Sequence, residues 1–256
     1  MTTMNVEIVF DERPELKDAI FIEGLPGVGN VGKLAAEHLL EEVGAKRFAV
    51  VFSKYFPPQV LVEDDGTIKL VRNELYYWKR DGGKGPDLVL LVGDYQGLTP
   101  EGQYELADTI IDLCVDMGVK RIYTLGGFGV GKMVEEPRVL GAATTEELVE
   151  EMKGKEVVFS RGEPGSGIVG ASGLLLGLGH MKGIGAVCLM GETSGYFIDP
   201  SAARQLLMIL GSLLDIQLDL SKLEEKADQI ERITTKLKDI EKMEKEGTFE
   251  DLSYIG

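Results

Sequence analysis

The sequence predicts an α/β fold in which a mixed, mostly parallel sheet is covered by helices on both faces. Short apolar runs alternate along the chain with segments that have the apolar spacing of amphipathic helices. The apolar runs are nearly free of charge, as expected of strands that are buried on both faces. Asp65-Gly66 separates two short alternating segments and predicts a hairpin, which adds antiparallel strands.

The first half of the chain alternates strands and helices. Residues 31–44 have a helical apolar spacing that ends at Gly44, and Thr99 is placed to cap a second helix that starts at Pro100. Tyr76, Tyr77 and Trp78 fit either a strand that packs on the core or an interface patch. The elements predicted here are strands at 19–24, 48–52 and 87–94, a hairpin in 58–80, and helices at 31–44 and 100–118.

The second half continues the alternation. The segment GASGLLLGLGHMKG predicts a glycine-punctuated helix that packs closely on a sheet, and Pro200 lies beside the start of the last helix of the domain. The elements predicted here are strands at 121–127, 156–160 and 185–192, and helices at 145–152, 170–183 and 201–216.

The C-terminal part has a different pattern. From Lys222 to Glu246 there is no Gly or Pro, and apolar residues recur with the heptad spacing of a coiled coil, with Lys226 as a polar exception. The seam residues are Leu223, Ile230, Ile233, Leu237 and Ile240. A lone helix of this type is marginal in water, so it needs either another subunit or its own domain as a partner. We therefore expect an α/β domain at 1–218, an oligomerisation helix at 219–246 and a tail at 247–256.

Composition limits the class of partner. The chain has 27 Lys and Arg against 43 Asp and Glu, a net charge of −16, which disfavours nucleic-acid binding and favours partners that are basic at the contact. No apolar stretch is long enough to span a membrane. Cys114 and Cys188 both lie in apolar runs, which predicts buried, reduced thiols in a cytoplasmic protein.

The stretch GLPGVGNVGK contains two overlapping phosphate-binding patterns. It reads as Gly27-x-Gly29-x-x-Gly32 and also as a P-loop that ends in Lys33. The next strand is not followed by the acid of a dinucleotide site, and Leu34 replaces the P-loop hydroxyl. Similar glycine spacings recur at 126–132 and 165–170. A structural strand-to-helix turn is therefore favoured, and an anion site that uses Gly27, Gly29, Gly32 and Lys33 stays open as the alternative.

The other candidate residues form no recognisable catalytic or metal pattern. The two histidines, His38 and His180, are in no metal-binding motif, so we predict no metal and no cofactor. Gly170-Ala-Ser172-Gly173 lacks the spacing of a nucleophile elbow. Asp94 and residues 192–194 follow predicted strands, where they either line a cleft or serve as loop and cap residues.

Several stretches in a fixed order together resemble the proteasome assembly chaperone 2 family, in its archaeal branch. They include IEGLPGVGNVGKLAAEHLL, SKYFPPQVLVEDDG, LVLLVGDYQ, GGFGVG, GASGLLLGLG and LMGETSGYFIDPSAARQLL, and the resemblance covers roughly Val6 to Leu214. It implies a phosphorylase/hydrolase-like fold without established catalysis. It also implies homo-oligomers that dock on the proteasome α-ring.

Members of that family can carry a C-terminal hydrophobic-Tyr-X tail that inserts between α subunits. Here Tyr254 is third from the end and follows Ser253, with Leu252 displaced by one position. The resemblance thus points to Leu252, Tyr254, Ile255 and Gly256 as the partner-binding residues, with a shift of about 3.5 Å at the terminal carboxylate.

Three functions follow as hypotheses. The first is a non-enzymatic assembly chaperone that contacts proteasome α subunits. The second is an enzyme or sensor that binds a nucleotide or another anion at the Gly27–Lys33 loop. The third is a scaffold that assembles only with a paralogous protein.

Overall fold

The computed structural model describes residues 5–80, 82, 85–159 and 167–229. The chain divides into two units, Met1–Leu218 and Asp219–Gly256. The elements of the first unit are β1 (Val6–Phe10), β2 (Ile20–Gly24), the 3-10 turn η1 (Val28–Asn30), α1 (Val31–Val43), β3 (Lys46–Ser53), β4 (Val60–Val62), β5 (Ile68–Leu70), β6 (Asn73–Trp78), β7 (Leu88–Gly93), α2 (Pro100–Asp116), β8 (Arg121–Gly129), β9 (Val139–Ala143), α3 (Glu146–Met152), β10 (Val157–Val158), α4 (Ala171–Met181), β11 (Gly185–Thr193) and α5 (Pro200–Leu214).

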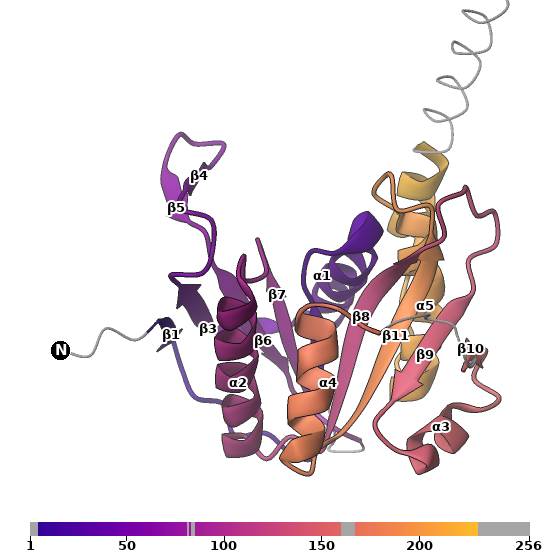
Figure 1. Ribbon diagram of the computed structural model, residues 1–256, viewed down its shortest axis with the longest axis horizontal. Helices are drawn as coiled ribbons and strands as arrows, with labels where there is room; N and C mark the ends of the chain where they lie inside the picture. The colour runs from indigo at the N-terminus through magenta and orange to yellow at the C-terminus, as the bar shows by residue number, and fades with distance from the viewer. Residues whose placement is uncertain (1–4, 81, 83–84, 160–166, 230–256) are drawn as a thin grey trace, which may run out of the picture. The chain divides into compact units, whose positions relative to one another are not determined.

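The first unit is built on a mixed sheet with the strand order β1-β3-β6-β7-β2-β8-β11-β9-β10. Helices α2 and α4 lie side by side on one face, and α1 and α5 lie on the other (Figure 1). The predicted α/β class, with a mixed sheet covered on both faces, is confirmed. The sheet is less parallel than predicted: in the described part, four strand pairings are parallel and four are antiparallel.

The parallel strands form the centre of the sheet, where the core is deepest. The strands β7, β2, β8 and β11 are neighbours and run in one direction. On β2, Phe21 and Ile22 point to opposite faces, and both are fully buried. Helices therefore cover this strand on both faces, which explains why the sequence shows a continuous apolar run there and no alternation.

Caps and prolines fix the starts of two helices. The Thr99 hydroxyl accepts a hydrogen bond from the Gly102 N–H at 3.1 Å, as the sequence predicts. Asp199 does the same for α5 by accepting from the Ala202 N–H at 3.0 Å, and Pro200 occupies the first helical position. Both helices start at the edge formed by the carboxyl ends of the parallel strands, where the connecting loops gather.

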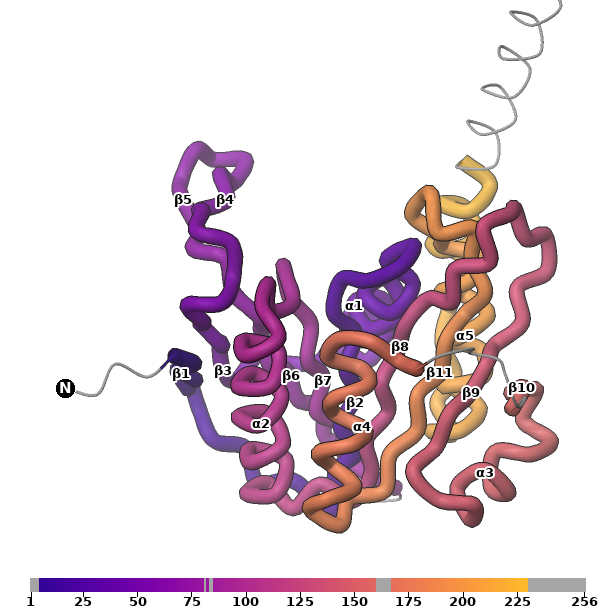
Figure 2. The backbone as a smooth tube through the Cα atoms, viewed as in Figure 1, coloured from indigo at the N-terminus to yellow at the C-terminus, as the bar shows by residue number. Residues whose placement is uncertain are grey.

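The predicted hairpin is confirmed. The strands β4 and β5 pair in antiparallel register around Asp65-Gly66 and form a sheet of their own. In Figure 2 this hairpin projects from the same edge of the main sheet at which β7 ends. Residues 73–78 form β6 inside the main sheet, which confirms the strand interpretation of Tyr76, Tyr77 and Trp78.

Two strands, β1 and β9, were not predicted. The segment VEIVF of β1 has the alternation and the β-branched residues of an edge strand, a local signal that the prediction overlooked, whereas VLGAA of β9 contains Gly and Ala in place of β-branched residues. Both are held by pairing with distant strands, β3 and β11, which local sequence cannot reveal.

In the second unit, residues 221–229 are helical and Leu223 is 1% exposed. The rest of the predicted heptad helix and the tail lie outside the described residues, so both remain predictions. Among the helices that the structure describes, none is long and apolar enough to cross a membrane.

Candidate functional site

The glycine stretch after β2 forms the turn from β2 into α1, and its glycines permit close backbone contact. A Cβ on Gly32 would lie 2.0 Å from the Leu125 carbonyl oxygen of β8, and one on Gly24 would lie 2.2 Å from the Ala36 Cβ. Gly29 has a φ of +62°, a left-handed conformation that favours glycine. A Cβ on Gly27 would meet nothing within 4 Å. Close packing of α1 on β2 and on β8 therefore explains Gly24 and Gly32, respectively, without a ligand.

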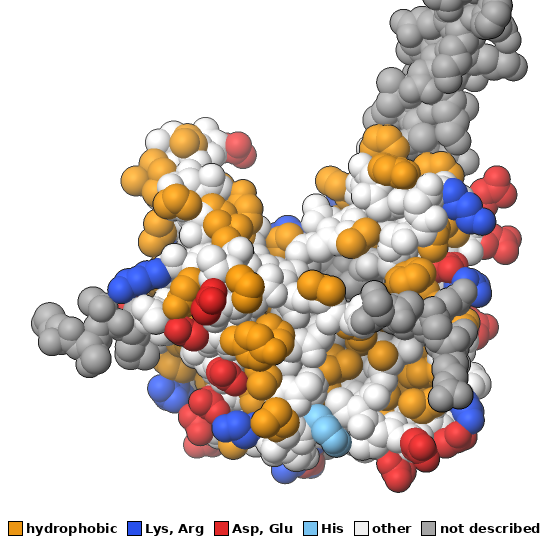
Figure 3. Space-filling view, in the orientation of Figure 1, with side chains coloured by type: hydrophobic (Ala, Val, Ile, Leu, Met, Phe, Trp, Pro, Cys, Tyr) orange, Lys and Arg blue, Asp and Glu red, His pale blue; other side chains and the backbone are white. Residues whose placement is uncertain are grey.

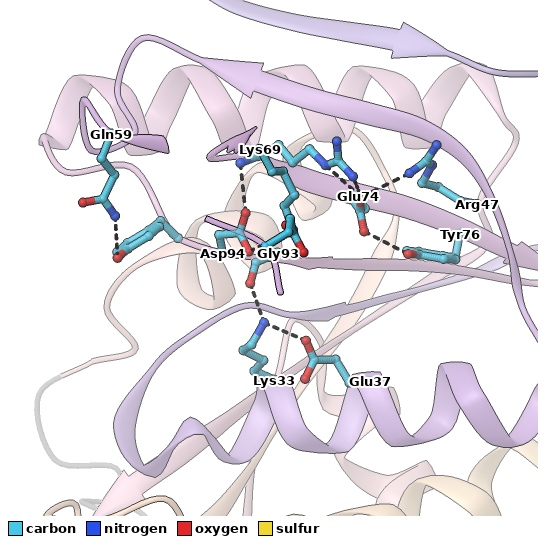
Figure 4. A network of polar contacts seen from close by, with 12 residues as sticks. Lys33, Glu37, Arg47, Gln59, Lys69, Glu74, Tyr76, Gly93 and Asp94 are labelled. Carbon is cyan, nitrogen blue, oxygen red and sulfur yellow. Dashed lines mark hydrogen bonds and ion pairs between the residues drawn. The ribbon is translucent and has the colours of Figure 1, made fainter. Parts of the chain in front are cut away.

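Lys33 of this turn is engaged by protein groups (Figure 4). Its ammonium donates to the Gly93 carbonyl oxygen at 2.8 Å and lies 2.6 Å from the Glu37 carboxylate one helical turn later. In a P-loop the equivalent lysine is free to contact phosphate. Here Lys33 instead ties α1 to the end of β7, which supports the structural interpretation of the turn.

Asp94, the candidate acid after β7, follows the Gly93 that Lys33 contacts and makes its own polar contacts (Figure 4). Its carboxylate accepts from the Arg72 backbone N–H at 3.2 Å and lies 3.8 Å from the Lys69 ammonium. The Asp94 N–H in turn donates to the Arg72 carbonyl oxygen at 3.1 Å. Asp94 therefore fastens the segment that carries the β4–β5 hairpin to the carboxyl end of β7.

A second carboxylate, Glu74 on β6, contacts polar side chains of β3, of β6 and of the residue before β6. It accepts hydrogen bonds from Tyr76 at 2.9 Å and from Arg72 at 2.8 Å, and Arg47 lies 3.3 Å away. Burial disfavours the charged form, but these partners outweigh it and hold the pKa of Glu74 below its usual value. Burial and the bond to Glu74 raise the pKa of Tyr76 to about 12. This network is satisfied within the chain and is structural.

An open cleft lies at the carboxyl ends of β8 and β11, with a volume of about 570 Å³. The ion pair between Arg138 and Glu192 lines this cleft. Arg138 Nε donates to Glu192 Oε2 at 2.9 Å, and Arg138 Nη2 donates to Glu192 Oε1 at 2.5 Å. The bonds from Arg138 hold the pKa of Glu192 below its usual value. The sequence-based suggestion that Glu192 lines a cleft is confirmed. Thr193 instead fixes the following turn, because its hydroxyl accepts from the Gly195 N–H at 3.3 Å.

A smaller cavity lies between α2, α4 and the carboxyl end of β7. Its enclosed volume is about 20 Å³, room for roughly one water molecule. Asn73 lines this cavity, and its Oδ1 atom is buried with no hydrogen-bond partner in the described structure. Neither this cavity nor the cleft is lined by Gly27, Gly29, Gly32 or Lys33.

Glu23, at the end of β2, is a buried carboxyl that the sequence analysis missed. It is fully buried and accepts hydrogen bonds from the Leu25 N–H and the Ser172 hydroxyl, both at 2.9 Å. Burial raises the pKa of Glu23 to about 7, although both hydrogen bonds favour the ionised form. The available signal was a single acid inside the apolar run AIFIEG.

The thiols behave as predicted. Cys114 and Cys188 are buried and form no disulfide, and burial raises the pKa of Cys188 to about 12, which disfavours its reactive thiolate. Within the ranges that the structure describes, no group of three or more His, Cys, Asp or Glu side chains is arranged to hold a metal ion.

The predicted partner-binding residues Leu252, Tyr254, Ile255 and Gly256 lie outside the described residues. So do four of the five predicted seam residues, Ile230, Ile233, Leu237 and Ile240. Only the first seam residue, Leu223, is described. The structure therefore does not test the predicted oligomerisation and docking residues, and those assignments remain predictions.

Comparison with known proteins decides the family. A sequence model of the PAC2 family matches residues 21–238, most of the chain. The chain belongs to the PAC2 family. Its similarity to an uncharacterized protein of Methanocaldococcus jannaschii is 43% identity, covering 94% of this chain and 93% of the relative.

Two solved structures place this PAC2 protein among archaeal relatives. Pyrococcus furiosus PbaB, described as an archaeal proteasome activator, matches with 41% identity and a TM-score of 0.88, covering 91% of this chain and 99% of PbaB. Pyrococcus furiosus PbaA, described as an archaeal homologue of proteasome-assembly chaperone, matches with 26% identity and a TM-score of 0.74, covering 98% of this chain and 100% of PbaA. The resemblance to the proteasome assembly chaperone family is thereby confirmed.

Proposed function

We propose that this protein is a non-enzymatic, homo-oligomeric partner of the proteasome that contacts the α-ring and acts in the manner of an assembly chaperone. The observation that carries the proposal is the likeness to PbaB and PbaA over nearly the whole chain, since both are described by a relation to the proteasome. The contacts made by Lys33 and Glu74 support it, because these charged groups are used within the fold.

The proposed mechanism is multivalent display of C-terminal tails. The predicted seam residues Ile230, Ile233, Leu237 and Ile240 join several copies, whereas Leu223 is already covered within its own chain. Each copy offers Leu252, Tyr254, Ile255 and the terminal carboxylate of Gly256 to the α-ring. Several weak contacts that are tethered together gain from effective concentrations in the millimolar range. The net charge of −16 favours basic contact surfaces on the partner.

The experiment is a binding assay with purified archaeal proteasome α subunits. It compares the full chain with a deletion of Asp251 to Gly256. We expect the deletion to bind much more weakly. Equal binding by both would remove the tail from the mechanism, and absence of binding by the full chain would reject the contact with α subunits.

The similarity to PbaB specifically favours a second candidate, activation of the assembled proteasome. An activator raises peptide hydrolysis by the complete particle, whereas an assembly chaperone raises the yield of α-rings from free subunits. Measuring both with the same protein preparation separates the two. Mixing with a paralogous PAC2 protein, followed by mass measurement, tests the scaffold hypothesis.

The anion-binding alternative keeps one inexpensive test. If the Gly27–Lys33 turn bound a nucleotide or phosphate, millimolar ligand would raise the melting temperature through linkage. The contacts of Lys33 with Gly93 and Glu37 lead us to expect no shift.

A further inference from the structure

The β4–β5 hairpin, residues 60–70, has two chemically different faces. Its register pairs Val60 with Leu70 and Val62 with Ile68, and between these pairs Leu61 lies opposite Lys69. Because side chains alternate along a strand, the four aliphatic residues share one face and Leu61 and Lys69 share the other. We call the first face the outer face of the arm and the second its inner face.

The outer face is exposed. Val62 and Ile68, near the tip, are 74% and 70% exposed, and Val60 and Leu70 are 45% and 55% exposed. Apolar side chains gather on this hairpin in the space-filling view, and an acidic side chain shows beside its tip (Figure 3). Scattered single apolar residues are common on protein surfaces, but these two adjacent cross-strand pairs form one continuous patch, which is the starting point for a docking proposal.

The inner face is tied to the domain. Leu61 packs on the hydrophobic core, and the Lys69 ammonium lies between Glu63 at 3.9 Å and Asp94 at 3.8 Å. At the base of the arm, Gln59 donates to the Tyr95 hydroxyl at 2.9 Å. These contacts hold the arm so that its outer face points away from the domain.

The turn of the arm is also fixed. The Asp65 carboxylate accepts from both the N–H and the hydroxyl of Thr67, at 2.9 and 2.7 Å, and the Glu63 N–H donates to the Thr67 carbonyl oxygen at 2.9 Å. A two-stranded hairpin is marginal on its own, so this bracing keeps four aliphatic residues in one arrangement before any partner binds.

The charges around the outer face indicate the kind of partner. Asp64 and Asp65 are exposed at the tip, and Lys69 is already paired with Glu63 and Asp94 on the inner face. A second copy of this chain would bring the same acidic tip and a net charge of −16, so like charges would oppose pairing. Stable dimers also use about 20–30 residues a side, far more than the arm offers. The arm therefore suits a supplementary contact with a different, basic protein surface.

We propose that the arm is a second docking element for the proteasome α subunits, separate from the C-terminal tail. Its outer face enters an apolar groove, and the carboxylates at its tip face Lys or Arg side chains on the rim of that groove. The inference rests on the proposed function for the identity of the partner. Its chemistry, an aliphatic patch with an acidic tip, comes from the arm alone.

The test uses full-length variants and purified archaeal α-rings. Val62→Ser with Ile68→Ser removes the apolar tip, and Asp64→Lys reverses one charge without touching the turn bonds of Asp65. The matched control, Val169→Ser with Met181→Ser, removes two apolar residues that are at least as exposed but lie elsewhere on the domain. Thermal unfolding verifies that every variant is folded.

We expect the arm double variant to bind the α-ring at least about tenfold more weakly and the control to stay within about twofold of the unaltered protein. Asp64→Lys should weaken binding and flatten its dependence on salt. Unchanged binding by the arm variants, while deletion of 251–256 abolishes binding, would overturn this inference and leave the proposed function standing. Absence of binding by the unaltered protein would overturn both. Loss of oligomer mass in the arm variant would assign the outer face to a contact between copies and overturn the inference as well.

Discussion

The Ser172 hydroxyl donates a 2.9 Å hydrogen bond to the buried carboxyl of Glu23, which ties the first turn of α4 to the end of the central strand β2. The other carboxyl oxygen accepts from the Leu25 N–H at 2.9 Å and so also fixes the start of the glycine turn. One buried acid thus joins the start of α4 to the turn that follows β2 at the carboxyl edge of the sheet.

Glu23 makes stability depend on pH. Its pKa is about 7 in the folded chain against 4.5 for the ordinary group, so between these values the folded state holds a proton that the unfolded state has released. Stability therefore falls as pH rises from about 4.5 to 7, by about 3 kcal/mol, and is flat above that range. Urea unfolding from pH 4.5 to 8 measures this change. Glu23→Gln, which keeps an acceptor for Leu25, should lose this part of the profile, and parallel profiles for the two proteins would contradict the prediction.

Two glycines of the same turn provide a matched pair. Gly32→Ala places a methyl group 2.0 Å from the Leu125 carbonyl oxygen, which forces α1 away from β8. We expect a loss of about 2–4 kcal/mol in the free energy of unfolding. Gly27→Ala meets nothing within 4 Å at an extended backbone position and should change stability by less than about 0.5 kcal/mol. Equal losses in the two variants would show that close packing is not the reason for glycine at position 32.

The Arg138–Glu192 ion pair should contribute more to the free energy of unfolding at neutral pH than in acid. Glu192 is 6% exposed, and Arg138→Met leaves its carboxylate without its main partner. Because the Arg138 side chain is half exposed, we expect a loss of about 1–2 kcal/mol at pH 7. The partnered Glu192 has a lowered pKa, so its contribution is present above the usual value and is lost as pH falls. The difference between the variant and the unaltered protein should therefore shrink below about pH 4.5. Adding Glu192→Gln to Arg138→Met should recover part of the loss.

Sequence patterns predicted the centre of this fold better than its edges. The β2 and β7 runs are apolar because both faces of these strands are covered, and such runs are visible locally. The strand β9 contains Gly and Ala and depends on pairing with the distant strand β11, so local composition does not reveal it. The same limit applies to the arm: Asp65-Gly66 predicts a hairpin, but every residue of VLV is apolar, so only the pairing register shows which face is exposed.

For the candidate site, the sequence was most informative where a motif requires a particular residue type at a particular position. The missing hydroxyl at Leu34 argued against a P-loop, and the bond from Lys33 to Gly93 supplies the physical reason for that lysine. Glu23 and Ser172 are 149 residues apart, so their contact has no signature in sequence spacing.

The ion pairs of Lys69 hold the arm on the domain, so their removal should increase local unfolding of residues 60–70. Lys69→Ala removes the ion pairs with Glu63 and Asp94 while leaving the turn bonds of Asp65 intact. Partly exposed pairs of this kind contribute about 0.2–1 kcal/mol, so hydrogen exchange at the amides of residues 60–70 should be about two- to fivefold faster. Global stability should be unchanged. Lys54→Ala, on an exposed lysine outside the arm, serves as the control, and equal exchange in both variants would contradict a tethering role for Lys69.

The heptad residues predict the largest change in assembly. Ile233→Asp with Leu237→Asp places two charges in the predicted seam, where a buried, unpaired carboxylate costs several kcal/mol. Thr235→Asp adds a charge on the same predicted helix but off the seam, at a position that faces solvent in a heptad. Light scattering should show the double variant at the mass of a single chain and the control at the mass of the unaltered oligomer. Circular dichroism should show that the α/β domain keeps its secondary structure in both. If the double variant keeps the oligomer mass, the copies associate through the α/β domain and the heptad helix packs within its own chain.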